Sequence, residues 1–97
     1  MTTRSQPPAP RPVERVQTGL RLEKRLLKVS KALADSLDLS LSDLVEGVLL
    51  HALESKAPFG EATLARATQL KQVFGLDLAA RDAHRLTERP AAARTAR

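Results

Sequence analysis

The apolar residues of this chain change their spacing at Glu23, and this change constrains the fold more than any other feature. In the preceding segment Val16, Thr18, Leu20 and Leu22 share one face, and Gln17, Gly19 and Arg21 share the other. Alternation with a period of two is typical of a short, half-buried β-strand. Since the sequence offers no second strand, we expect the strand over residues 16–22 to pair with the same strand of another copy.

After Glu23 the spacing becomes helical. Apolar residues recur at three- and four-residue intervals, at Leu26, Val29, Leu33 and Leu37. This pattern predicts an amphipathic helix of about fourteen residues. Asp38 and Leu39 form the turn that follows it.

A second helix is predicted from Ser40 onward. The Ser40 hydroxyl is placed to accept from the Asp43 N–H, and the Asp43 carboxylate to accept from the Ser40 N–H, as in a capping box. The apolar face of this helix comprises Leu41, Leu44, Val45, Val48, Leu49, Ala52 and Leu53. One short helix in one subunit cannot cover so wide a face, which again indicates a partner subunit. Gly47, in mid-helix, marks either a close approach of two helices or a tolerated surface glycine.

A third helix is predicted from about Glu61 to Phe74, with Gly75 as its stop, and a short fourth helix over 76–86. The apolar stripe of the third helix consists of Leu64, Ala67, Leu70 and Phe74. Two interpretations of residues 59–86 stay open. Either they fold back over the apolar edge of the dimer, with Phe59 as the anchor, or they dock a partner protein as a helix in a groove.

The two ends of the 97-residue chain differ from its middle. Residues 1–15 contain four prolines, and the last nine residues read RPAAARTAR. Neither end has enough apolar surface to offset the entropy of ordering. We therefore expect disordered tails over 1–15 and 89–97, a domain over 16–56 and a helical extension over 57–88. A core this small needs reinforcement, and the absence of cysteine leaves oligomerisation to supply it.

Charge is segregated along the sequence. Residues 15–31 contain six cations and one carboxylate, whereas residues 38–54 contain four carboxylates and no lysine or arginine. The basic segment suits a polyanion. Equally, the two segments can form oppositely charged helix faces that attract each other.

The motifs of enzymes are missing from the sequence. His51 and His84 lack neighbours at metal-ligand spacing, no glycine-rich phosphate loop occurs, and two phenylalanines make no stacking platform for single strands. We expect a non-enzyme without cofactor or metal. No apolar run is long enough to span a bilayer, and no signal-peptide pattern opens the chain. A cytoplasmic, nucleoid-associated protein is expected.

Two stretches, LRLEKRLL over 20–27 and LDLSLSDLV over 37–45, resemble the ribbon–helix–helix family of the Arc, MetJ and CopG class. The resemblance covers residues 16–55. Asp38 stands where the family usually has glycine, and Glu23 where proline is frequent. Asp tolerates left-handed backbone better than most residues, so the turn remains possible.

The resemblance implies a mostly α-helical homodimer whose N-terminal strands form an antiparallel ribbon in the major groove of duplex DNA. Base contacts would come from Gln17, Gly19 and Arg21. Phosphate contacts would come from the start of the second helix and from basic side chains: Ser40, Leu41, Ser42, Lys24, Arg25 and Lys28. The dimer core would contain Leu20, Leu22, Leu33, Leu44, Val45, Val48 and Leu49.

The expected function is that of a sequence-specific DNA-binding dimer, a transcriptional repressor or autoregulator. One alternative is an antitoxin whose C-terminal helices, within residues 59–86, bind a toxin. A second alternative is a dimerisation adaptor that has lost DNA contact, with Gly19 as the trace of that loss.

Overall fold

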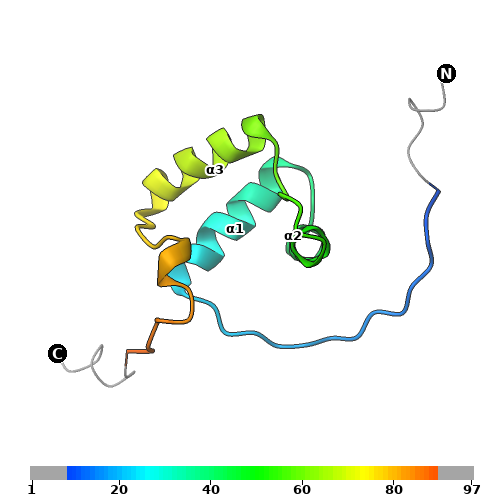
Figure 1. Ribbon diagram of the computed structural model, residues 1–97, viewed down its shortest axis with the longest axis horizontal. Coiled ribbons are helices and arrows are strands. Elements are labelled where there is room, and N and C mark those ends of the chain that lie inside the picture. Colours follow the sequence, from blue (N-terminus) through cyan, green and yellow to red (C-terminus); the bar gives the residue numbers. More distant parts are fainter. Residues whose placement is uncertain (1–8, 90–97) are drawn as a thin grey trace.

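The computed structural model describes residues 9–89, in which three α-helices are followed by one short 3-10 turn. The helices are α1 (Lys24–Ser36), α2 (Leu41–Leu53) and α3 (Glu61–Phe74), and the turn is η2 (Ala80–Asp82). Figure 1 shows α1 and α3 running side by side while α2 is seen end-on, so α2 crosses the pair steeply. The three predicted helices are thus present, whereas the fourth, expected over 76–86, shrinks to η2.

The predicted strand over 16–22 is wrong, and with it the ribbon–helix–helix fold. Residues 9–23 contain no strand; they run as an extended segment past α2 to the start of α1 (Figure 1). Val16 and Leu20 are 79% and 70% exposed. A strand needs a neighbouring backbone for its N–H and C=O groups, and no backbone group within 9–89 forms a hydrogen bond with the backbone of residues 9–22. The mostly helical class of the expectation stands.

Local capping explains where α1 begins and ends. The Glu23 carboxylate accepts from the Leu26 N–H at 2.8 Å, which satisfies one of the free donors of the first turn. After α1 the chain reverses at Asp38, whose φ is +58°. Asp38 therefore occupies the left-handed region, which Asp tolerates better than most residues.

The start of α2 confirms half of the predicted capping box. Ser40 Oγ accepts from the Asp43 N–H at 3.0 Å. The return bond from the Ser40 N–H to Asp43 is not among the hydrogen bonds of residues 9–89. Instead, Asp43 Oδ1 lies 3.9 Å from Arg15 Nη2 of the extended segment.

The core lies where α1, α2 and α3 meet. Leu33, Ala34 and Leu44 are buried at its centre. The half-buried side chains packed around them are Leu37, Leu41, Val48, Phe59, Ala67 and Leu70. Since Ala67 and Leu70 belong to α3, this helix folds back onto α1, with Phe59 packed beside it. Gly75 ends α3 with φ +67°, the left-handed conformation expected of a glycine stop.

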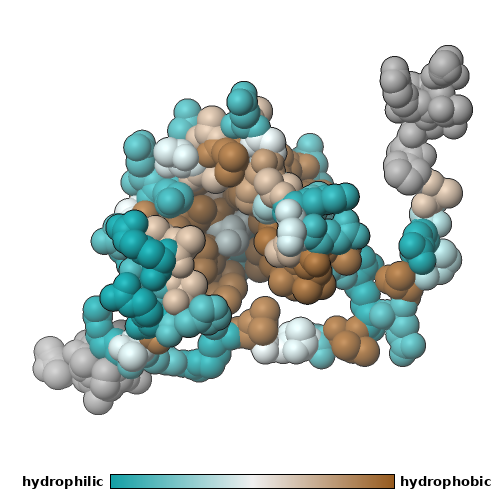
Figure 2. Space-filling model, viewed as in Figure 1, coloured by the Kyte–Doolittle hydropathy of each residue, from teal (hydrophilic) through white to brown (hydrophobic). Residues whose placement is uncertain are grey.

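The outer side of α2 is not covered by any other described element. Leu49, Leu50 and Leu53 are 55%, 65% and 82% exposed. Figure 2 shows apolar side chains gathered over α2 and others isolated along the extended segment. A Cβ built on Gly47 would meet no atom within 4 Å, so within residues 9–89 no helix approaches this glycine.

The residues predicted as a dimer core divide into three groups. Leu33 and Leu44 are buried inside the single chain, and Val45 and Val48 are half-buried. Leu20, Leu22 and Leu49 are exposed. Three of the predicted interface residues, Leu33, Leu44 and Val48, therefore pack in or against the chain's own core.

Candidate nucleic-acid interface

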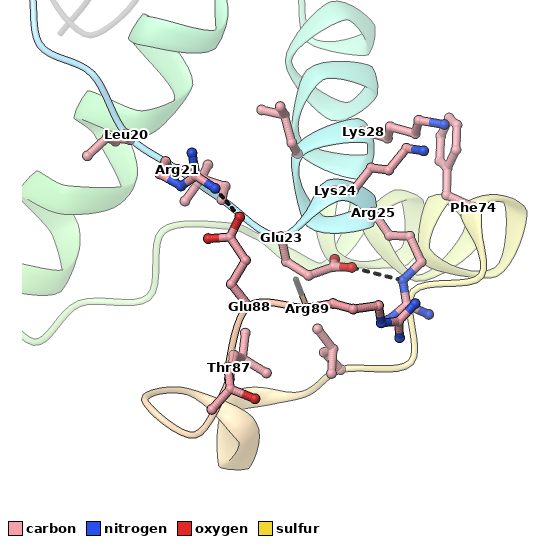
Figure 3. A pocket seen from close by; sticks show the side chains of 14 residues that line it. Leu20, Arg21, Glu23, Lys24, Arg25, Lys28, Phe74, Thr87, Glu88 and Arg89 are labelled. Atoms are coloured by element: carbon pink, nitrogen blue, oxygen red, sulfur yellow. Dashed lines mark hydrogen bonds and ion pairs between the residues drawn. The ribbon is translucent and has the colours of Figure 1, made fainter. Parts of the chain in front are cut away.

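An open groove of about 1250 Å³ lies where the extended segment, the start of α1, the end of α3 and the chain after α3 meet (Figure 3). Its apolar lining comes from Leu20, Leu22, Leu27, Phe74, Leu78 and Leu86. Its charged lining comes from Arg21, Lys24, Arg25, Lys28 and Arg89, and from Glu23 and Glu88. Five cations against two carboxylates make the groove suitable for an anion.

A row of lysines follows one face of α1, of which Lys24 and Lys28 line this groove. Lys24, Lys28 and Lys31 are separated by four and three residues, a spacing that places them on the same side of a helix. All three are exposed, and none makes an ion pair with any residue in 9–89. In Figure 3, Lys24 and Lys28 project from α1 on the side of Phe74. Their charges are available to a ligand.

Arg25, although predicted as a phosphate contact, is engaged within the chain. Its Nε lies 3.1 Å from Glu23 Oε2, and its Nη1 lies 3.1 Å from Asp77 Oδ1. Nη1 also donates to the Gly75 carbonyl at 2.8 Å. Arg25 thereby joins the start of α1 to the end of α3, which is a structural role.

The pKa values at this junction follow from the same contacts. Partial burial of Glu23 acts to raise its pKa, but the hydrogen bonds from the Leu26 N–H and from Arg25 outweigh it, so the pKa is lowered. The hydrogen bond with Glu23 raises the pKa of Arg25, and the charge of Asp77 adds to this effect. The pair is therefore fully charged at neutral pH.

The three predicted base-reading residues are not presented by a ribbon. Gln17, Gly19 and Arg21 lie exposed in the extended segment. Arg21 forms an ion pair with Glu88, which Figure 3 shows as a dashed line. Without paired strands, nothing in 9–89 holds these side chains in the register that groove reading needs.

The start of α2, which was predicted to bind phosphate through Ser40, Leu41 and Ser42, has an acidic neighbourhood. Arg15 makes a two-point contact with Glu46, in which Nε and Nη2 each lie 2.7 Å from a carboxylate oxygen. The hydrogen bond from Arg15 lowers the pKa of Glu46. The predicted phosphate contacts therefore lie in two separate places, the start of α2 and the groove. Of these two surfaces, the groove is the one with an excess of positive charge.

Sequence reasoning did not single out Lys31, which continues the lysine row along α1 beyond the groove, although its spacing from Lys28 was a usable signal. It also missed the Arg15–Glu46 contact, which no local pattern reveals. Within residues 9–89 no group of three metal-ligating side chains occurs, and no helix is long and apolar enough to cross a bilayer. Comparison of the chain with protein-family models, curated proteins and solved structures finds no match, so the site is interpreted from its own residues.

Proposed function

We propose that the protein binds duplex DNA through the phosphate backbone, with the lysine row of α1 as the contact surface. One observation carries the proposal: Lys24, Lys28 and Lys31 are exposed on one helix face and have no ion-pair partner in the described chain. The groove beside them adds further positive charge.

The chemistry of lysine fits this ligand. Duplex DNA carries one negative charge per about 1.7 Å of its axis, and each lysine that neutralises a phosphate releases condensed counterions. Lysine acts as a flexible point charge on phosphate, and phosphate contacts position a protein on DNA without reading its sequence. The proposal is therefore limited to backbone-directed binding, and its cellular setting is the nucleoid. Repression of particular genes requires base contacts in addition.

The test is fluorescence anisotropy with a labelled duplex over about 50 to 200 mM salt. Wild type is expected to bind with strongly salt-dependent affinity. Lys28→Ala and Lys31→Ala should each weaken binding to all duplexes and lower the salt slope by about one. The matched control is Lys56→Ala, which removes the same charge from a lysine beyond α2 that lies 3.3 Å from Glu54. An affinity for duplex DNA that does not change with salt concentration contradicts the proposal. So does an equal loss of affinity in the Lys56→Ala control.

We further propose that the DNA-binding form is a homodimer joined along the outer side of α2. Support comes from Leu49, Leu50 and Leu53, whose neighbouring exposed side chains make the most apolar helix surface of the described chain. Covering them with a second copy removes this surface from water.

Sedimentation equilibrium tests the dimer. Leu53→Asp should place an unpaired charge in the interface and produce a monomer. Val73→Asp is the control, since Val73 is 72% exposed on α3. A wild-type protein that remains monomeric at micromolar concentration, or identical behaviour of the two variants, refutes this interface.

A further inference from the structure

The chain after α3, residues 75–89 (the post-α3 segment), returns to the cationic groove. Leu78, Leu86, Thr87, Glu88 and Arg89 all line it. Two carboxylates of this segment pair with arginines on the opposite wall. Glu88 pairs with Arg21, and Asp77 Oδ1 lies 3.1 Å from Arg25 Nη1. Figure 3 shows Glu88 reaching across to Arg21.

The two arginines differ from the neighbouring lysines in this respect. Glu88 is the only ion-pair partner of Arg21 within residues 9–89, and it comes from 67 residues further along the chain. Lys24 and Lys28 border the same groove and have no such partner there. The post-α3 segment therefore supplies negative charge at the point where an incoming phosphate would find its guanidinium partners.

These contacts are suited to exchange. The side chains of Arg21 and Glu88 are 81% and 68% exposed, and that of Asp77 is 80% exposed. Ion pairs in contact with water contribute little to stability, so a phosphate can replace either carboxylate at small cost. Arg25 keeps its contacts with Glu23 and with the Gly75 carbonyl when Asp77 leaves, so the junction between α1 and the end of α3 remains intact.

We propose that the post-α3 segment is an internal competitor for DNA. It occupies Arg21 and Arg25 in the free protein, and it is displaced when phosphates take the places of Glu88 and Asp77. This inference rests on the proposed DNA binding and adds its regulation: release of the Asp77 and Glu88 contacts frees Arg21 and Arg25 for phosphate, while Arg89 of the same segment is itself one of the cations of the groove.

The first test compares two full-length double variants with the same change of charge. Asp77→Asn/Glu88→Gln removes both competing carboxylates. Glu54→Gln/Glu61→Gln removes two carboxylates elsewhere, one beyond α2 and one in the first turn of α3. At low salt we expect the first variant to bind duplex DNA about fivefold more tightly than the control, the size of effect that exposed pairs permit. Equal affinities of the two variants overturn the inference.

The second test needs no DNA for its first step. Because the chain has no cysteine, Thr87→Cys can carry a single nitroxide label next to Glu88. In the free protein the label should broaden the amide resonances of residues 21–28, and Asp77→Asn/Glu88→Gln should reduce this broadening. Saturating duplex should reduce it as well. Broadening that is missing in the free protein, or that persists unchanged with DNA bound, overturns the inference.

The two tests separate the proposals. If no variant binds duplex DNA, the proposed function fails, and with it the regulation of DNA binding. Broadening in the free protein would then still establish the contact between the post-α3 segment and α1. If wild type binds DNA and only the comparison of the double variants fails, the function stands and the internal competition is wrong.

Discussion

The α1–α3 pair and the outer side of α2 both contain amphipathic helices, but the apolar face is buried in the first region and exposed in the second. Leu33 and Ala34 of α1 are 4% and 2% exposed because α3 and the inner side of α2 lie against them. Leu50 and Leu53 of α2 are 65% and 82% exposed because no described element covers them. A helical apolar pattern thus predicts which face of a helix favours burial. Whether another element of the same chain buries that face depends on the rest of the fold.

The largest effect is expected from removing the internal cover. Truncation after Lys56 deletes Phe59 and α3, which leaves Leu33 and Ala34 open to water. We expect the truncated chain to lose its cooperative thermal transition in far-ultraviolet circular dichroism. A truncated protein that melts like wild type would mean that α3 is dispensable for folding. That outcome would favour the interpretation in which residues 59–86 bind a partner, such as the toxin of an antitoxin pair.

A smaller loss is expected from a single core truncation. Leu33→Ala should lower the free energy of unfolding by about 2–5 kcal/mol, because the cavity lies between three helices that cannot all close on it. Val73→Ala, on the exposed side of α3, should change it by less than about 0.5 kcal/mol. Denaturant titration measures both. Similar losses in the two variants would show that α3 packs through a different face.

Gly47→Ala probes the uncovered side of α2. An added Cβ meets no atom within 4 Å, so the helix should gain up to about 1 kcal/mol from alanine's higher propensity. Thermal denaturation of the variant at several protein concentrations measures this gain. A loss of stability that grows on dilution would instead reveal a second copy packed against Gly47, as the close-approach interpretation of this glycine requires.

The smallest effect concerns the extended segment. Glu46 has a lowered pKa because of its hydrogen bond with Arg15. The contact is therefore complete above the ordinary pKa of a glutamate and is lost as the pH falls through the lowered value. Amide chemical shifts of residues 13–17 should move together over that acidic range and return on neutralisation. Arg15→Gln should remove this common transition; its persistence would assign it to another carboxylate.

The sequence predicted the helices well because their signals are local. Ser40 as the cap of α2, Asp38 in a left-handed turn and Gly75 as the stop of α3 each depend on a few neighbouring residues. The strand over 16–22 failed for the opposite reason. Alternation states which side chains would share a face, but a strand exists only where another backbone pairs with it.

The candidate site was predicted in part, and the same distinction explains the rest. Lys24 and Lys28 could be placed from helical spacing, and Lys31 could have been. The engagement of Arg25 by Asp77 and of Arg21 by Glu88 could not, because these partners meet only after α3 has folded back. Long-range ion pairs leave no periodic trace in a sequence, so the division of the basic residues into free and engaged ones needed the structure.

The ion pairs of Arg21 and Arg25 also hold the chain before α1 and the chain after α3 close together, at one corner of the molecule (Figure 1). A folded unit whose two ends lie together can be inserted into a surface loop of another protein without separating the two ends of that loop. For the same reason its ends can be joined and new ones opened, for instance between α2 and α3, where the chain is exposed. The helical unit is therefore suited to transfer, as one piece, from one scaffold protein to another.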